Sequence, residues 1–395
     1  MGSNRTSLLR KIESDWFGQH FLLSLFISFF VLEAVNKIAG EGSDLRQYTS
    51  IIKGVWFGLL AILLMFYSER KFYYGVLALL VCFAIGQFTL DTPFTANSIL
   101  IFGKFLFPLF LFQVTSALSI SDTAKRKLLT LFEWIIIGNS LLVIAAALLS
   151  IDVLSTYQGK RFGYNGLFAA VSTSSYIYIL ALFYFLTKHG HQVLKNLKFW
   201  IVIGACLLMG TKSIFLALGF ASLYILWVFP LRFKWIYYTV GALIFLSISY
   251  YFFFESGLFN IIRKNDGLLS AILSYRNELL VEYTWPYITE KWSYLNYIFG
   301  GTNNYNLRSQ IGLIDTLFFW GLGGAVLFVA MYLKTLLTFT VNAPIASFLI
   351  FLALVVSLAG NFFTYSLVAV SLAVLKLYWE QSTMKTYNQG NSYIK

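Results

Sequence analysis

Residues 125–150 read KRKLLTLFEWIIIGNSLLVIAAALLS. Three cations come first, and a block of mostly apolar residues follows over 128–150. An α-helix needs about 20 such residues to cross the hydrocarbon core of a bilayer. This stretch therefore predicts a membrane-spanning helix that begins beside a basic loop.

Similar apolar blocks recur along the chain, which is 58% hydrophobic and only 12% charged. A soluble domain carries about 25% charged residues, so this chain has too few charges to cover a water-facing surface. The blocks are also too long for the alternating strands of a membrane β-barrel. We predict a single all-α polytopic membrane domain over residues 1–395 with about twelve spans. They lie at approximately 18–39, 51–67, 72–89, 97–119, 128–150, 166–187, 199–210, 213–229, 235–254, 312–333, 343–360 and 362–379.

Basic residues predict the orientation of these spans. If the N-terminus is inside, the early inside loops all carry cations, as cytoplasmic loops typically do. These cations are Arg5, Arg10, Lys11, Arg70, Lys71, Lys125, Arg126, Lys127, Lys188, Lys195, Lys198, Arg232 and Lys234. The pattern continues only if 199–210 and 213–229 both cross, which predicts that both termini are cytoplasmic. The net charge of +12 then reflects topology and attraction to anionic lipids, not nucleic-acid binding.

Neither the first apolar run nor the cysteines indicate a secreted protein. The run at 18–39 is too long for the core of a cleavable signal peptide, so we interpret it as the first span. Cys82 and Cys206 fall inside apolar spans, where they are expected to pack and not to form a disulfide or a metal cluster.

One long connection, at 255–311, is predicted to lie on the outer side. It contains an amphipathic stretch, Leu268 to Trp285, which we expect to form one helix at the membrane interface that ends at Pro286. Aromatic residues gather in this connection, where they could stack on sugar rings or form part of an interfacial belt. They are Tyr283, Trp285, Tyr287, Trp292, Tyr294 and Tyr305.

Cations on the predicted outer side are contrary to the excess of cations in inside loops. Their presence there therefore needs another explanation. They are Lys160, Arg161, Lys212, Arg276 and Arg308, with Lys212 in the turn Gly210 to Ser213. An arginine guanidinium can donate hydrogen bonds to two phosphate oxygens at once, and a lysine ammonium supplies a single positive charge. Together these cations predict a pocket that binds a membrane-bound phosphate or pyrophosphate. The alternative is that each side chain only reaches outward to lipid headgroups.

Lys104 is the ionisable residue that we place in the membrane interior, where such residues are functional candidates unless they reach the surface. The candidate general bases are Glu278, Glu282 and Asp315, although each could equally be a solvated helix charge. The three histidines do not form a pair with metal-ligand geometry on the outer side, so no zinc site is predicted.

Small residues indicate helix packing at two places. Gly54 and Gly58 have the GxxxG spacing, and Gly321, Gly323 and Gly324 form a second small-residue patch.

Four short motifs carry a resemblance to a known family. Arg161 with Gly163 and Asn165 is similar to its first motif, and Lys212 stands where the family more often has arginine. Arg276 with Gly300 resembles its loop motif. Asp315 with Gly321 and Gly324 is similar to the segment that opens the next span. The chain thus resembles the O-antigen polymerase and ligase superfamily, particularly the Wzy-type repeat-unit polymerases. Ligases carry a histidine in the outer loop and this loop has none, which favours a polymerase.

The resemblance implies a metal-independent glycosyltransferase of GT-C-like fold, without cofactor, at the outer face of the bacterial inner membrane. Its donor would be a growing glycan linked to undecaprenyl pyrophosphate, and its acceptor a lipid-linked repeat unit of O-antigen or capsule. Membrane lipids, a chain-length regulator and a flippase would be its partners. The motif residues and the charged and aromatic residues described above together give the predicted site. The predicted catalytic residues are Arg161, Lys212, Arg276, Glu278 and Asp315, and the predicted binding residues are Lys160, Asn165, Arg308, Lys104, Tyr283 and Trp285.

Three alternatives stay open: a ligase, a peptidoglycan polymerase of the shape-and-division type, and a flippase for lipid-linked oligosaccharides. A flippase would need charged residues along the membrane interior, and Lys104 alone is placed there, which speaks against this alternative.

Overall fold

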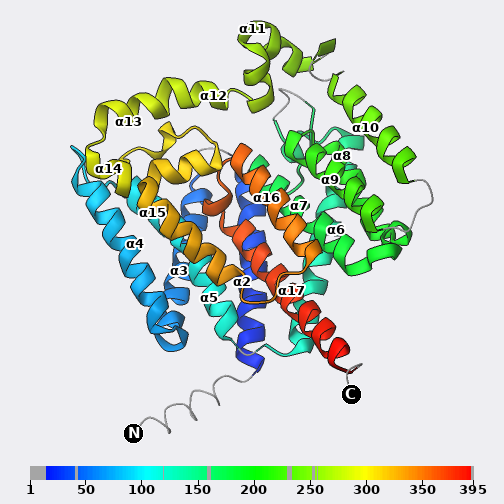
Figure 1. Ribbon diagram of the computed structural model, residues 1–395, viewed down its shortest axis with the longest axis horizontal. Helices are drawn as coiled ribbons and strands as arrows, with labels where there is room; N and C mark the ends of the chain where they lie inside the picture. The colour runs from blue at the N-terminus through cyan, green and yellow to red at the C-terminus, as the bar shows by residue number, and fades with distance from the viewer. Residues whose placement is uncertain are drawn as a thin grey trace.

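The computed structural model describes residues 15–40, 43–118, 120–157, 162–228, 234–250, 254–255 and 257–392. These residues form a bundle that is almost entirely helical (Figure 1). Within them, the β-structure is an isolated bridge between Ser155 and Tyr164.

The helices follow the apolar blocks of the sequence. The first group is α2 (Asp15–Ala39), α3 (Leu45–Tyr67), α4 (Arg70–Phe88), α5 (Ala96–Ala117) and α6 (Asp122–Leu149). The second is α7 (Val171–His189), α8 (Leu197–Leu208), α9 (Lys212–Val228) and α10 (Lys234–Tyr250). The long connection contains α11 (Gly257–Leu273), α12 (Arg276–Leu279), α13 (Trp285–Lys291) and α14 (Tyr294–Phe299). The last group is α15 (Gly312–Leu336), α16 (Ala343–Leu358) and α17 (Ser366–Ser392).

Six of the helices in the described ranges are long and apolar enough to cross a membrane: α2, α3, α4, α5, α6 and α15. Three more, α8, α9 and α16, are apolar but shorter. Several apolar helices of spanning length in one chain are the mark of a multi-pass membrane protein. The predicted all-α membrane fold is confirmed at this level.

The centre of the bundle is formed by α7 and α17, which pack on each other. Every residue of α7 from Thr173 to Leu186 is buried. A helix that is buried on all sides is surrounded by other helices and has no face turned toward lipid. By contrast, α3 turns Ile51, Ile62 and Met65 outward, as expected for a helix that faces lipid.

The two ends of the bundle differ. The helices α11 to α14 lie over one end, which we call the loop end, and the beginning of α2 and the end of α17 lie at the other (Figure 1). The long connection of the sequence therefore sits on the side opposite to the described ends of the chain.

A tight turn separates α8 from α9, as predicted. Gly210 takes a left-handed φ of 66° there, and a Cβ added to it would lie 2.5 Å from the Phe162 carbonyl oxygen. The neighbouring loop is fixed to this turn, because the Tyr164 amide donates to the Leu208 carbonyl at 2.9 Å. The turn therefore anchors the loop that precedes α7.

The predicted single amphipathic helix from Leu268 to Trp285 is wrong. α11 ends at Leu273, and the next two residues, Ser274 and Tyr275, adopt left-handed φ values of 55° and 65°. Pro286 does not end a helix either, because helical backbone runs from Arg276 to Lys291, with a π-helical turn at Leu280–Thr284 directly before α13. Side-chain periodicity gave no sign of this break in the backbone.

The two glycine predictions have different outcomes. Among the described residues, no atom lies within 4 Å of a Cβ placed on Gly54 or Gly58, so this pair does not pack helices within the chain. A Cβ on Gly323 would lie 3.1 Å from Ile298, and one on Gly321 would strike the backbone of Gly300. The second patch is therefore a packing contact between α15 and the segment at the end of α14.

Candidate functional site

Asp315 is a buried carboxylate in the first turn of α15, with 2% of its surface exposed. Its Oδ1 accepts a hydrogen bond from the Ser309 hydroxyl at 3.0 Å. Its Oδ2 has no hydrogen-bond partner in the described part of the chain. Arg308 and the Gln310 backbone also act on this carboxylate, but Oδ2 keeps the capacity to accept a hydrogen bond or a proton from a ligand.

Arg308 lies beside this oxygen, with its Nε 4.0 Å from Asp315 Oδ2. The same Nε donates to Asn361 Oδ1 at 3.1 Å, and Nη1 donates to the Tyr305 carbonyl at 3.0 Å. The guanidinium also stacks over the Tyr305 ring, 4.8 Å from its centroid. These contacts hold the planar group in one orientation next to the carboxylate.

Arg276 is the second cation close enough to act on the charge of Asp315. Its Nη1 donates to the Leu358 carbonyl at 2.8 Å, at the C-terminus of α16, where a helix attracts positive charge. Burial lowers the pKa of Arg276, while Tyr176 and Asp315 act in the opposite direction. An arginine remains charged under such opposing effects, so the charges of two guanidinium groups, Arg308 and Arg276, act on one carboxylate.

Two tyrosines and the α16–α17 connection complete the site. The Tyr176 hydroxyl donates to the Ala359 carbonyl at 2.7 Å, and the Tyr365 hydroxyl accepts from Ser172 at 3.1 Å. Because Gly360 has no side chain, there is room beside it for the Asp315 carboxylate. A Cβ at position 360 would lie only 2.9 Å from Oδ2. We call Asp315, Arg276, Arg308, Tyr176 and Tyr365 the Asp315 cluster.

Further charges adjoin this cluster. Lys104 on α5 is exposed, makes no hydrogen bond or ion pair with the described residues, and lies close enough to Lys53 and Arg308 to be influenced by their charges. Lys53 on α3 pairs with Glu33 on α2 at 2.9 Å. Unpaired ammonium groups in a spanning helix are costly unless they meet an anion or water. Lys104 is therefore suited to contact a phosphate next to the arginines.

The expectation that Lys104 alone is ionisable in the interior is wrong. Glu33 and Lys53 lie in spanning helices, and so does Glu133 on α6. Lys376 on α17 is 0% exposed and donates to the Thr335 carbonyl at 2.6 Å and to Ser116.

Glu133 and Lys376 belong to internal bridges and not to the Asp315 cluster. Glu133 accepts from Tyr184 at 2.7 Å and pairs with Lys188 and with Lys198, the latter at 3.0 Å. Buried charges with complete sets of partners hold helices in register. In the part of the chain that the structure describes, the charges near Asp315 are therefore the better candidates for binding a ligand.

Lys212, predicted to hold pyrophosphate, contacts the long connection instead. Its ammonium donates to the Ala271 carbonyl, to the Ile272 carbonyl at 3.0 Å and to the Ser274 hydroxyl at 2.9 Å. Lys160 and Arg161 lie outside the described residues. Of the predicted basic pocket, Arg276 and Arg308 are thus brought together with Asp315.

Asn165, predicted to bind substrate, is fully buried and its side chain is occupied within the protein. Its Oδ1 accepts from the Lys37 ammonium at 2.8 Å, and its Nδ2 donates to the Phe168 carbonyl at 2.8 Å. Lys37 also donates to the Ser155 carbonyl at 2.6 Å. Asn165 therefore fixes the loop before α7 to α2.

Replacing Asn165 by alanine is expected to destabilise the protein by about 1–3 kcal/mol, because the Lys37 ammonium would lose a buried acceptor. Thermal unfolding of the purified protein in detergent measures this change. Asn306→Ala, at an exposed position, serves as the control and should leave the unfolding temperature unchanged. A stability equal to that of the unmodified protein would contradict the structural role of Asn165.

The other predicted residues of the connection divide into two groups. Glu278 is half-buried and Glu282 exposed, and neither makes a hydrogen bond or ion pair with the described residues. Tyr283 and Trp285 are 48% and 58% exposed and remain available to a sugar. Of the other aromatic residues of the connection, Tyr294 is exposed, Tyr287 and Trp292 lie against Phe318, and Tyr305 is buried.

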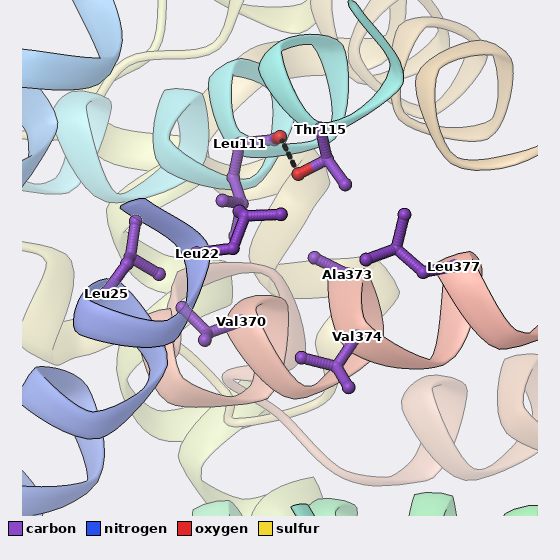
Figure 2. A pocket seen from close by; sticks show the side chains of 8 residues that line it. All are labelled: Leu22, Leu25, Leu111, Thr115, Val370, Ala373, Val374 and Leu377. Atoms are coloured by element: carbon purple, nitrogen blue, oxygen red, sulfur yellow. Dashed lines mark hydrogen bonds between the residues drawn. The ribbon is translucent and has the colours of Figure 1, made fainter. Parts of the chain in front are cut away.

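A small apolar cavity lies between α2, α5 and α17 (Figure 2). It is lined by Leu22, Leu25, Leu111, Thr115, Val370, Ala373, Val374 and Leu377. Its polar group, the Thr115 hydroxyl, donates to the Leu111 carbonyl at 2.7 Å. With a volume of about 10 Å³ it can hold at most one water, so it is a packing gap and not a ligand site.

Some of the residues that the sequence analysis overlooked could have been found by its own rules, and others could not. Glu33 and Lys53 stand inside predicted spans, so the rule that flagged Lys104 would have found them. Tyr176 and Tyr365 gave no signal, because aromatic residues make up 19% of this chain.

No protein-family model matches this chain, and no curated protein or solved structure is detectably similar to it.

Proposed function

We propose that this chain is a bacterial membrane glycosyltransferase that polymerises lipid-linked repeat units of a surface polysaccharide, O-antigen or capsule. The observation that carries the proposal is the buried Oδ2 of Asp315, which accepts no hydrogen bond from the described residues, lies 4.0 Å from Arg308 Nε and is influenced by the charge of Arg276. A carboxylate beside two guanidinium groups supplies what glycosyl transfer from a pyrophosphate requires: a base, and positive charge for the leaving group.

In the proposed reaction, a hydroxyl of the acceptor sugar attacks the anomeric carbon of the donor glycan. Asp315 Oδ2 takes the hydroxyl proton as the new glycosidic bond forms. The bond between the anomeric carbon and the pyrophosphate oxygen breaks, and its electron pair leaves with the pyrophosphate. Arg276 and Arg308 would bind the phosphate oxygens and stabilise the charge that grows on them.

The residues next to the cluster suit a lipid-linked substrate. Lys104 is exposed on a spanning helix, where it can reach a phosphate whose lipid chain stays in the bilayer. Tyr283 and Trp285 offer exposed aromatic faces at the loop end for the glycan. The donor under this proposal is a growing glycan on undecaprenyl pyrophosphate, and the acceptor is a lipid-linked repeat unit.

The topology of the proposal has about twelve spans in a GT-C-like bundle, with the shorter apolar helices also crossing. The loop end would face outward from the inner membrane, and both termini would be cytoplasmic, which agrees with the basic residues at 70–71 and 125–127. A flippase would supply the repeat units, and a chain-length regulator would set the length of the product.

A flippase for lipid-linked oligosaccharides is a second candidate function. It is favoured by the ionisable residues Glu33, Lys53 and Lys104, which lie together in spanning helices. Glu33 and Lys53 neutralise one another, however, so they do not form a continuous charged path across the bundle. The polymerase accounts better for the buried Asp315 carboxylate, whose Oδ2 accepts no hydrogen bond from the described residues.

Replacing Arg276 by alanine tests the proposed function. We expect long glycan to fall by on the order of 10²-fold, because one of the two groups that stabilise the leaving pyrophosphate is removed. The measurement is the banding pattern of surface glycan in cells that carry the variant. Lys264→Ala, an exposed cation of α11, is the matched control. Normal glycan length at normal protein level in the Arg276→Ala strain would refute the assignment.

Deleting the gene separates the candidate functions. Loss of all bands above one repeat indicates a polymerase. Intact polymer stranded on its lipid carrier indicates a ligase, and repeat units retained on the cytoplasmic face indicate a flippase.

A further inference from the structure

Lys212 is the first residue of α9, and its ammonium caps the end of another helix. It donates to the carbonyls of Ala271 and Ile272 in the last turn of α11, and to the Ser274 hydroxyl directly after it. It also lies 3.9 Å from the centroid of the Phe259 ring. A lysine ammonium has three hydrogens, so these acceptors use its donor capacity.

The backbone around Lys212 is fixed by the inner bundle. The Thr211 hydroxyl, one residue earlier, lies 3.1 Å from the Ser175 hydroxyl of the central helix α7. Gly210 packs against the Phe162 carbonyl. The ammonium thus projects from a rigid point of the bundle onto the long connection.

The segment that Lys212 holds is the strained junction between α11 and α12. Ser274 and Tyr275 are consecutive non-glycine residues in the left-handed region, which is unfavourable for L-amino acids and persists only where surrounding contacts enforce it. Tyr275 is also restrained by hydrogen bonds, from its hydroxyl to Asp266 at 3.0 Å and from its amide to the Ser270 carbonyl. Arg276 follows immediately as the first residue of α12.

We infer that Lys212 is a positioning residue: by holding the α11–α12 junction, it places the Arg276 guanidinium at the Asp315 cluster. This inference rests on the proposed function of that cluster. It assigns Lys212 a role through Arg276, without contact to the substrate. Three contacts link the bundle to Arg276. Thr211 is held by Ser175, and the adjacent Lys212 donates to Ser274. Arg276 follows two residues after Ser274, and its Nη1 donates to the Leu358 carbonyl.

A double-mutant cycle tests this role. In the otherwise unmodified protein, Lys212→Met is expected to lower the rate of polymer formation on the order of 10- to 100-fold, since it misplaces a charged group at the reaction centre. In an Arg276→Lys background, where the guanidinium is already absent, the same substitution is expected to have little further effect. Rates are measured with membranes that contain equal amounts of each variant and a lipid-linked repeat unit as substrate.

Hydrogen exchange supplies a readout independent of activity. The amides of Tyr275 and Leu279 donate to the carbonyls of Ser270 and Tyr275, and they should exchange faster in Lys212→Met but keep their protection in Lys212→Arg. Lys264→Met, at an exposed position of α11 before its kink at Gly267, is the control and should change neither rate nor exchange.

The outcomes separate the inference from the proposed function. If Lys212→Met lowers the rate by the same factor in both backgrounds, Lys212 acts independently of Arg276 and the positioning role is refuted, while the polymerase assignment stands. Unchanged exchange at Tyr275 and Leu279 would refute the role as well. If Arg276→Lys and Arg276→Ala both leave the rate unchanged, the proposed function itself fails.

Discussion

Replacing Asp315 by asparagine is expected to lower polymer formation by about 10²- to 10⁴-fold, the usual contribution of a general base. Asparagine has nearly the same shape as aspartate, and its amide can still accept the hydrogen bond from Ser309. It cannot take a proton from the acceptor hydroxyl at Oδ2. The rate of glycan elongation in membranes that contain the variant measures the effect.

The controls for this experiment lie in the long connection. Glu282→Gln removes an exposed carboxylate without described partners and should leave the elongation rate unchanged. Glu278→Gln tests the remaining candidate base. If Asp315→Asn retained normal elongation while Glu278→Gln abolished it, the base would be Glu278, and Asp315 would only orient Arg308.

The sequence predicted part of this site for a clear physical reason. Arg276, Arg308 and Asp315 are charged residues next to apolar blocks, and such residues stand out in a chain with few charges. The positions of their partners could not be predicted, because Tyr176 and Ala359 are far apart in the chain and meet only through the packing of α7 on α17. The contacts of Lys212 could not be predicted for the same reason: its charge is visible in the sequence, but the end of α11 that it caps is not.

The fold, too, could be predicted only in part. Apolar blocks of spanning length predicted the helices of the bundle well, since each block is decided by local composition. The break at Ser274 and Tyr275 was missed, because neither residue is a glycine and the side-chain pattern continues across it. The GxxxG spacing at Gly54 suggested a contact that the described chain does not make, since spacing alone does not identify the face that a helix buries.

Gly321→Ala is the substitution with the largest expected effect on stability. Gly321 interrupts α15 with φ 64° and ψ −176°, a conformation that is essentially restricted to glycine. A Cβ at this position would strike the amide nitrogen of Gly300 and lie 2.5 Å from the carbonyl carbon of Ile298. The strain costs about 1–3 kcal/mol, and the overpacking costs about as much again.

The effect is expected to be large because backbones from three elements meet at this point. A Cβ on Gly300 would in turn strike Gly321, and one on Gly86, in α4, would lie 2.6 Å from the Gly300 carbonyl oxygen. Asn296 bridges the same contact by donating to the Gly86 carbonyl at 2.9 Å. None of these atoms belongs to a flexible side-chain end, so the clash cannot be relieved without moving a helix.

Thermal unfolding in detergent, together with the amount of protein in membranes, measures the change. Gly54→Ala and Gly58→Ala are matched controls, because nothing in the described chain lies within 4 Å of a Cβ at either position. Both should retain full stability, since alanine is the better helix former. A Gly321→Ala variant as stable as these two would contradict the close contact between α4, α14 and α15. Because that contact fixes the start of α15, the same variant should also displace Asp315 and lose polymer formation even at temperatures where it remains folded.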